Sequence, residues 1–386
     1  MMKLRDLVAL MQEVAPLEYA EDWDRAGLQV GVPERELTGA ILLTIDLTEA
    51  VLAEAIGQGC SAIIAYHCPI WNPLTTLTDT SAKERVVRGA IEHGIAIYSP
   101  HTALDAAPGG VTDWLCEGLS GGSENQIAGD CRALVPHLRV ERNRQLKIVV
   151  FVPENDVDAL RNALGTAGAG TIGAYRLCSF ATPGTGTFFG AETAAPRMGT
   201  TGRLEKIPEV RLEMVCSKAA LPLVIQTLRE FHPYEEPAFD VYELVGTQLR
   251  SAGLGRRLVL DRPATVVELA DRLSAHLNVN RVKYALAGEA DEMIRHVGVI
   301  PGSGEDLLDL ATREGCRVFV TGEMRHHAVV AALQQGVSVI LGGHTPTERG
   351  YLPRLAQRLT AMGPDVPVLV SRQDRDLFTM AGQKKS

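Results

Sequence analysis

One pattern occurs twice in this chain, and each copy ends in a histidine followed four residues later by a carboxylate. The first copy covers residues 59–67 and 94–105, and the second covers 315–323 and 336–348. In each copy a helix-length stretch separates two short apolar runs, which predicts a repeated α/β unit. The repeat therefore constrains the chain to two related lobes that carry imidazole and carboxylate groups where their strands end.

Length and composition limit the class of protein. A chain of 386 residues predicts two or three domains, and its shares of hydrophobic (46%) and charged (22%) residues are typical of a soluble globular protein. The net charge of −9 disfavours broad binding to nucleic acid or to an anionic membrane. The amphipathic start lacks the apolar core of a signal peptide, and seven cysteines without a C-x-x-C pair predict reduced thiols, so we expect a cytoplasmic location.

The alternation of helices and strands divides the chain into three parts. We predict a first α/β lobe at 1–127, an inserted domain at 128–250 and a second α/β lobe at 251–386. Helices of about ten residues between short buried strands predict largely parallel sheets that are covered on both faces. From residue 146 the order changes to β-α-β-β-α-β, which predicts a ferredoxin-like insert.

The individual elements follow from hydrophobic periodicity and from the breaks between periodic segments. The predicted helices cover residues 4–14, 48–56, 82–93, 109–119, 156–164, 221–230, 266–277, 304–314, 325–335 and 347–360. The predicted strands cover residues 40–45, 62–65, 95–99, 146–152, 210–216, 239–245, 296–300, 318–320, 337–341 and 368–370.

Polar groups with metal-ligand chemistry follow the apolar strands. The two pairs are His101 with Asp105 and His344 with Glu348. His67 ends the preceding strand of the first lobe, and Glu323 occupies the matching place in the second. Ligands of open α/β sheets collect outside the carboxyl ends of the strands, so these groups would converge if the lobes face each other. Imidazole and carboxylate without cysteine suit zinc, manganese or iron.

Helix capping is the alternative explanation of the two carboxylates. Residues 345–348 read Thr-Pro-Thr-Glu, a capping box with proline at the first helical position, and 102–105 is a weaker version. Capping alone accounts for both acids, but it does not require a histidine before each threonine, so we favour the metal site. Taken alone, His67 is explained equally well as a histidine satisfied at a strand end.

Other motifs carry weaker signals. His326 and His327 follow Glu323 at a helix start and cannot both share one face with it, so at most one points to a site. Residues 232–236 (HPYEE) suit a strand entry or a subunit contact better than catalysis. The glycine-rich run at 165–173 lacks a P-loop lysine and a dinucleotide fingerprint, and it predicts tight turns.

Taken together, several stretches resemble the Nif-three-like family, also called GTP cyclohydrolase I type 2 homologues. They are AEDWDRAGLQVG (20–31), AYHCPIWNPL (65–74), SPHTALDAAPGG (99–110), TGEMRHH (321–327) and GGHTPTERG (342–350). The insert resembles that of the long bacterial members through GTIGAYRLCSF, GTGTFFG and HPYEEPAFD. The resemblance covers nearly the whole chain. It implies two related lobes of the Nif-three-like fold with a CutA-like inserted domain.

The resemblance also implies a centre of two divalent metal ions, zinc, iron or manganese, between the lobes. By motif, the ligands carried over to this sequence are His67, Asp105, His344 and Glu348. Tyr66 stands where many members have a second histidine. Tyr66, His101 and Glu323 are therefore expected to support the ligands or to replace one.

The activity that the resemblance implies is hydrolysis by a metal-activated water, on GTP or another nucleotide-like substrate, in a homohexamer. The alternative is a protein that binds or delivers metal, or acts as a scaffold, without catalysis. A role in nucleic-acid binding fits the acidic charge poorly. No catalytic residue is assigned from the sequence.

Overall fold

The computed structural model describes residues 2–123, 125–139, 141, 143–376 and 378. The chain forms two compact units: unit 1 consists of Met1–His137 with Leu249–Ser386, and unit 2 consists of Leu138–Gln248. Strands β5 (Gly129–Arg139) and β10 (Thr247–Ala264) are neighbours in a sheet of unit 1 and lead the chain into and out of unit 2. Residues 128–137, which fall within the predicted insert, are therefore part of unit 1.

The first sheet of unit 1 has the strand order β1-β4-β3-β2-β15. Its strands are β1 (Gly27–Val30), β2 (Ile41–Thr44), β3 (Ala62–Ala65), β4 (Ala96–Ser99) and β15 (Val368–Val370). All but β1 run parallel to their neighbours, and every residue of β2, β3 and β4 is buried. Continuous apolar strands are required in a parallel sheet that helices cover on both faces, so the prediction of such a sheet is confirmed here.

The second sheet of unit 1 has the order β11-β14-β13-β12-β10-β5. The remaining strands are β11 (Lys283–Ala285), β12 (Ile294–Val299), β13 (Val318–Thr321) and β14 (Ser338–Leu341). The pairs β12–β13 and β13–β14 are parallel, whereas β10 and β11 pair antiparallel with β12 and β14. This parallel core repeats that of the first sheet, as the duplicated sequence predicts.

The helices of unit 1 lie between these strands in the chain. They are α1 (Leu4–Val14), α2 (Glu49–Gly57), α3 (Ala82–Glu92), α4 (His101–Ala106), α5 (Val111–Ser120), α8 (Val266–His276), α9 (Leu308–Arg313), α10 (His326–Gln334), α11 (Pro346–Arg349) and α12 (Leu352–Ala361), with short 3-10 turns at Leu17–Tyr19 and Glu305–Leu307. Thr48, Ser81 and Thr265 each accept a backbone N–H at the start of α2, α3 and α8, which fixes where these helices begin.

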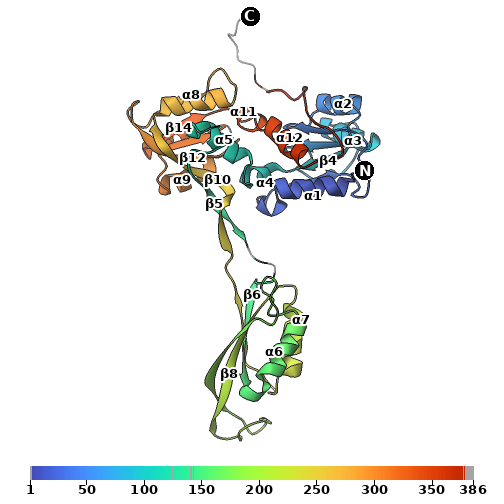
Figure 1. Ribbon diagram of the computed structural model, residues 1–386, viewed down its shortest axis with the longest axis vertical. Coiled ribbons are helices and arrows are strands. Elements are labelled where there is room, and N and C mark those ends of the chain that lie inside the picture. Colours follow the sequence, from blue (N-terminus) through green and yellow to red (C-terminus); the bar gives the residue numbers. More distant parts are fainter. Residues whose placement is uncertain (1, 124, 140, 142, 377, 379–386) are drawn as a thin grey trace, which may run out of the picture. The chain divides into compact units, whose positions relative to one another are not determined.

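The two lobes exchange elements. Strand β15, from the end of the chain, pairs with β2 in the first sheet, and α12 packs against β15, β2 and α1. In the other direction, α5 packs against α8 and β12 of the second lobe (Figure 1). One hydrophobic core contains Ile41 and Ile64 of the first sheet together with Val318 and Val320 of the second. The predicted segment 251–386 therefore also supplies part of the first lobe, and the shared core holds the lobes as one body.

Unit 2 has the element order β6 (Leu146–Pro153), α6 (Val157–Thr166), β7 (Ser179–Phe189), β8 (Leu204–Cys216), α7 (Leu221–Phe231) and β9 (Phe239–Glu243). Its sheet has the order β7-β8-β6-β9 with antiparallel pairs throughout. A separate core of apolar residues from β6, β8, α6 and α7 fills the space between sheet and helices. The prediction of a ferredoxin-like insert is confirmed.

Some predicted elements differ from the structure. The single helix predicted at 347–360 is divided into α11 and α12. Pro353 opens α12 because proline is tolerated in a first turn but not within a continuous helix. A side-chain carbon on Gly350 would lie 2.3 Å from the Trp114 ring, so the break also fits a close contact. Strands β1, β5, β10 and β11 and the short helix α4 were not predicted.

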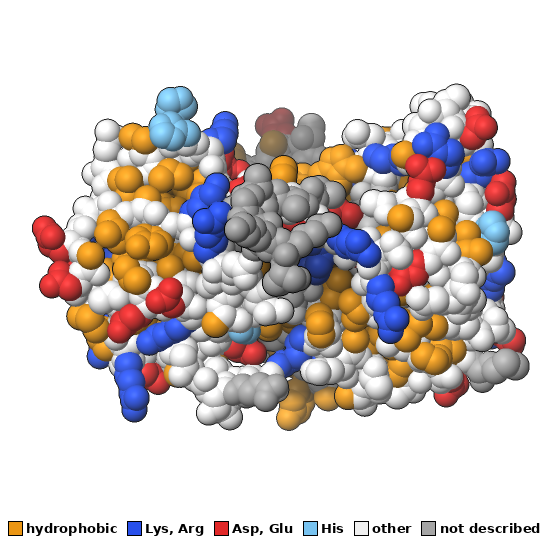
Figure 2. Space-filling view, turned by 90° about the horizontal axis from the view of Figure 1, so that it is seen from above, with side chains coloured by type: hydrophobic (Ala, Val, Ile, Leu, Met, Phe, Trp, Pro, Cys, Tyr) orange, Lys and Arg blue, Asp and Glu red, His pale blue; other side chains and the backbone are white. Residues whose placement is uncertain are grey.

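The surface is mixed in character. On the face shown in Figure 2, acidic and basic side chains are interspersed among hydrophobic ones. Across the described residues, no helix combines the length and the apolar content needed to cross a bilayer.

Arg256 gives a test of the packing between the lobes. Its guanidinium is 1% exposed and donates to Asp113 Oδ1 at 2.5 Å and to the backbone carbonyls of Gly253 and Ala106 at 2.7 and 3.2 Å. Arg256→Ala leaves these acceptors buried and unpaired, so we expect it to lower the free energy of unfolding of unit 1 by about 3–5 kcal/mol.

The measurement is urea unfolding followed by tryptophan fluorescence, since Trp23, Trp71 and Trp114 all lie in unit 1. The matched control is Arg257→Ala, because the neighbouring Arg257 makes one exposed hydrogen bond, to the carbonyl of Glu314. Its effect should stay within about 0.5 kcal/mol. Equal effects of the two substitutions would contradict the assignment.

Candidate metal centre

Two histidines and a glutamate from distant parts of the chain meet in unit 1. His67 Nε2 lies 3.4 Å from Glu348 Oε2, and His344 Nε2 lies 3.3 Å from Glu348 Oε1. One ligand atom from each of the three residues lies within 4.8 Å of the others. Three of the side chains that the sequence singles out therefore converge.

The topology explains this convergence. His67 follows β3 of the first sheet, His344 follows β14 of the second, and Glu348 lies in the short helix α11 behind His344. Both strands belong to the parallel parts of their sheets, whose carboxyl ends collect polar groups. The site therefore joins the two lobes of unit 1.

Helix capping does not account for the carboxylates. The Thr345 side chain makes no capping hydrogen bond, and the Glu348 carboxylate faces the two imidazoles instead of the backbone at the start of α11. Asp105 is the fifth residue of α4 and accepts a hydrogen bond from a side chain, that of Tyr66. The geometry favours a ligand-binding role for Glu348 over capping.

Each imidazole of the site is held by a second carboxylate. His67 Nδ1 lies 2.9 Å from Asp46 Oδ1, and His344 Nδ1 lies 2.9 Å from Glu323 Oε1. When Nδ1–H donates to a carboxylate, Nε2 carries the lone pair of the neutral ring, which is the usual arrangement of metal-binding histidines. Glu323 thus supports a predicted ligand. Asp46 was missed, although its place directly after the strand β2 was a signal.

The charges around the imidazoles favour their protonated form when no metal competes. Burial lowers the pKa of His67, but the hydrogen bond with Asp46 and the nearby Glu348 carboxylate outweigh burial and raise it to about 10. The hydrogen bond with Glu348 is the main cause that raises the pKa of His344 to about 9. For Glu348, burial raises the pKa, yet the two histidines outweigh this and leave it below its ordinary value.

The environment of Glu348 fits a bound cation. The residue is 3% exposed, and its Oε2 has no hydrogen-bond donor among the described residues, because the ion pair with His67 is not a well-formed hydrogen bond. A buried carboxylate oxygen without a donor is costly unless another positive group satisfies it. Gly302 keeps the space open, since a side-chain carbon there would lie 2.5 Å from Glu348 Oε1. Imidazole and carboxylate are suitable ligands for zinc, iron and manganese.

Tyr66 and Asp105 form a separate buried pair. The Tyr66 hydroxyl donates to Asp105 Oδ1 at 2.6 Å. Burial, followed by the nearby Asp105 and Glu348 carboxylates, raises the pKa of Tyr66 well above its usual range, and burial raises the pKa of Asp105 to about 7. Asp105 does not belong to the group of ligand atoms that His67, His344 and Glu348 form.

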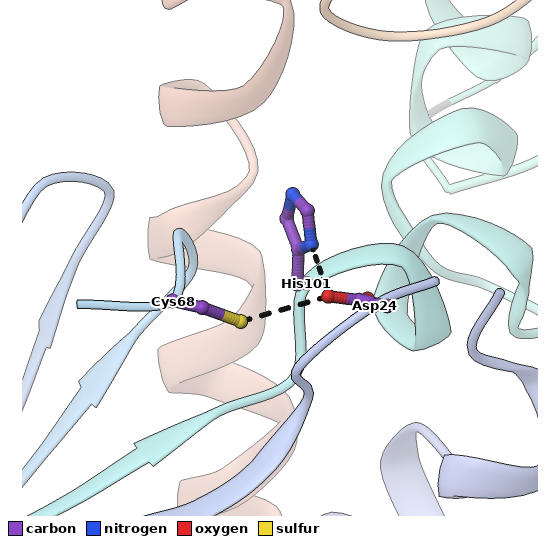
Figure 3. Close-up of side chains that lie close together, drawn as sticks. All are labelled: Asp24, Cys68 and His101. Carbon is purple, nitrogen blue, oxygen red and sulfur yellow. Dashed lines mark hydrogen bonds and ion pairs between the residues drawn. The ribbon is translucent and has the colours of Figure 1, made fainter. Parts of the chain in front are cut away.

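Asp24, Cys68 and His101 form a second group with metal-ligand chemistry (Figure 3). Asp24 accepts from His101 Nδ1 at 2.7 Å, from the backbone N–H of Arg25 at 2.6 Å and from Thr102, and its carboxylate is 1% exposed. Burial opposes ionisation of Asp24, but these donors outweigh it and lower its pKa to about 2. His101 is thereby held at φ 35°, an unusual conformation for this residue type.

Aromatic side chains extend from this group to the surface. The rings of Trp71 and Trp23 lie 5.7 and 6.2 Å from that of His101, which lies 5.7 Å from the ring of His67. Trp23 is 56% exposed and Trp71 is 38% exposed. Both tryptophans therefore lie beside His101, whose ring in turn lies beside that of His67. No periodicity in the sequence indicated this role.

The weaker motifs lie elsewhere. His326 and His327 are exposed at the start of α10 and contact each other. In unit 2, His232 is buried, and its Nε2 lies 2.9 Å from the carbonyl oxygen of Phe151, which fits a structural role. The glycine-rich run contains turn glycines with positive φ at Gly168, Gly170 and Gly173, as predicted for tight turns.

This chain is similar in sequence and fold to known proteins. The sequence profile of Duf34/NIF3 (NGG1p interacting factor 3) matches residues 2–376. A Bacillus subtilis (strain 168) protein named GTP cyclohydrolase 1 type 2 homolog is 34% identical over 379 residues, which cover 97% of this chain and 98% of that protein. The crystal structure of a Bacillus cereus protein related to NIF3 aligns with a TM-score of 0.63 and 32% identity, covering 98% of this chain and 99% of that one. The Staphylococcus aureus protein SA1388 aligns with a TM-score of 0.75 and 26% identity over the same shares.

The raised pKa values of the histidines predict a pH dependence of metal binding. A metal ligand must be a neutral imidazole, so binding displaces the protons that His67 and His344 hold up to pH values of about 10 and 9. We expect the affinity for Zn²⁺ to rise between pH 6.5 and 8.5, by about tenfold per pH unit for each proton displaced.

Titration calorimetry in buffers of different ionisation enthalpy measures both the affinity and the protons released. His327→Ala should keep the same pH dependence, because His327 is an exposed histidine outside the group of ligand atoms. In the metal-free protein, the protonated His67 and His344 stabilise the fold fully below pH 6.5, and this contribution is lost as the pH rises towards 9–10. An affinity that does not change with pH would contradict the assignment of the ligands.

Proposed function

Because the chain belongs to the Duf34/NIF3 family, we propose that unit 1 binds a divalent metal ion at His67, His344 and Glu348 and uses it for hydrolysis. The observation that carries the proposal is that ligand atoms of these three residues lie within 4.8 Å of one another. One of the two buried Glu348 oxygens has no hydrogen-bond donor among the described residues. Zinc, iron and manganese all accept this set of ligands.

The residues of this chain have defined roles in such a site. Asp46 and Glu323 orient the two imidazoles so that each Nε2 faces Glu348. When bound, a divalent ion lowers the pKa of a coordinated water and polarises an electrophile. Trp23 and Trp71 provide exposed apolar surface beside His101.

The candidate substrate comes from the relatives. The B. subtilis protein is named GTP cyclohydrolase 1 type 2 homolog, so GTP is the first compound to assay, with release of formate from the purine as the readout. Other nucleotides, phosphoesters and amides follow. The competing proposal is a protein that binds or delivers metal without catalysis, and it predicts stoichiometric metal with no turnover of any of these compounds.

Removal of one ligand tests the site. We expect His344→Ala to lose most of the metal that the purified protein holds, because the remaining His67 and Glu348 cannot complete a three-ligand set. Elemental analysis of the purified protein, before and after incubation with Zn²⁺, Mn²⁺ or Fe²⁺, measures the change. Any hydrolytic turnover should fall at least a hundredfold in the same variant.

The matched control is again His327→Ala, which removes an exposed imidazole and should keep both metal and turnover. Circular dichroism of both variants shows whether the fold is kept. Full metal content in folded His344→Ala would rule out the proposed site. Metal that is lost with His344, in a protein without turnover, would favour the non-catalytic alternative.

A further inference from the structure

We infer that this chain holds one metal ion at His67, His344 and Glu348, and that the hydrogen-bonded pair Tyr66–Asp105 closes the position that a second ion would need. The inference rests on the proposed function only in that the site binds metal. It differs from the pair of ions that the family resemblance implies, and it follows from the contacts of Tyr66 and Asp105.

The distances at Glu348 suit one ion. Ligand atoms about 2.1 Å from a tetrahedral metal lie about 3.4 Å from one another. The observed separations between imidazole nitrogens and carboxylate oxygens are 3.4 Å for His67 and 3.3 Å for His344. His67 faces Oε2 and His344 faces Oε1 of the same carboxylate. One ligand atom from each of the three residues lies within 4.8 Å of the others, so a small movement brings all three to a single ion.

A second ion would need ligands that Tyr66 does not provide. Proteins bind zinc through cysteine, histidine, aspartate and glutamate, and a neutral phenol is not among these ligands. Tyr66 is 3% exposed, and its only hydroxyl proton is donated to Asp105 Oδ1 at 2.6 Å. A histidine at this position would offer a nitrogen lone pair, whereas the tyrosine offers a donor.

Asp105 is already engaged in hydrogen bonds of its own. One of its oxygens accepts the Tyr66 hydroxyl, and its backbone carbonyl accepts the Thr112 hydroxyl at 2.9 Å, which ties α4 to α5. It lies outside the group in which the ligand atoms of His67, His344 and Glu348 lie within 4.8 Å of one another. An ion bound by Asp105 would have to displace the short hydrogen bond from Tyr66.

The group of Asp24, Cys68 and His101 does not provide a site for a second metal ion. Figure 3 shows His101 Nδ1 and Cys68 Sγ both directed at the Asp24 carboxylate. The Cys68 thiol also lies 3.2 Å from Ser99 Oγ, to which it donates. An ion there would have to break several of these bonds at once. The group is better described as a hydrogen-bond network that holds His101.

A single ion changes the expected chemistry. Two imidazoles and one carboxylate form the ligand set of mononuclear zinc hydrolases, in which the fourth position is kept for a water or a substrate atom. Two-metal hydrolases instead share the attacking and leaving oxygens between ions about 3.5–4 Å apart. A single ion held by His67, His344 and Glu348 would supply one activated water and one Lewis-acid centre for hydrolysis.

The test is the number of metal ions per chain, measured without reference to activity. Metal-free protein is titrated with Zn²⁺ by calorimetry and with Mn²⁺ by electron paramagnetic resonance, in which two neighbouring Mn²⁺ ions lose the hyperfine pattern of isolated ions. We expect one equivalent in the unaltered protein and one in Asp105→Asn. Tyr66→His should raise the number to two, because it restores a nitrogen ligand and frees Asp105.

Each contrary result overturns the inference. These results are two tightly bound equivalents in the unaltered protein, loss of metal in folded Asp105→Asn, and a single equivalent in Tyr66→His. Should Asp105→Asn fail to fold, the unaltered protein and Tyr66→His decide the question. A protein that takes up no metal refutes this inference and the proposed function together. One equivalent without hydrolysis refutes only the hydrolase.

Discussion

The buried carboxylate of Glu348 is the group on which the functional architecture depends. At 3% exposure it faces one imidazole from each lobe, so it is stabilised only when both lobes are in place. A charge in such a position is costly without compensation from positive groups or a metal ion. Protonated histidines supply this compensation in the metal-free protein, and a bound cation would supply it otherwise. His67, His344 and Glu348 would therefore stabilise the metal-free protein as ion pairs and act as ligands when a metal ion is bound.

The fold holds the two lobes together by exchanged elements and a shared core. β15 completes the first sheet from the end of the chain, α5 covers the second lobe from the first, and a single hydrophobic core runs through both. Arg256 supports this arrangement. Its buried guanidinium donates to the Asp113 side chain of α5 and to the backbone carbonyls of Ala106 and Gly253. A site with ligands from both lobes keeps its geometry only on such a rigid support.

Local patterns in the sequence predicted the parts of the fold and site that depend on local interactions. The buried strands before His67 and His344 have a continuous apolar pattern, and the repeat itself indicated that their ends carry related chemistry. The long-range partners were not predictable in this way. Asp46 follows a buried strand, and Asp24 lies in the acidic segment 21–24. Only the folded chain shows that these carboxylates reach the rings of His67 and His101. Strand β15 was correctly located, but nothing in its own sequence says that it pairs with β2.

His67, His344 and His101 are each oriented by a carboxylate at Nδ1, but their rings face different groups. Each Nδ1 faces a carboxylate, from Asp46, Glu323 or Asp24, so each ring is oriented before any ligand arrives. Two of the rings face Glu348, whereas His101 is held at a positive φ by a carboxylate that accepts several other donors. Strain of this kind persists only where the surroundings over-determine it, and it concentrates at functional sites. The position of His101, between the exposed tryptophans and His67, is therefore built into the fold at an energetic cost, which is expected if the ring contacts whatever enters the site.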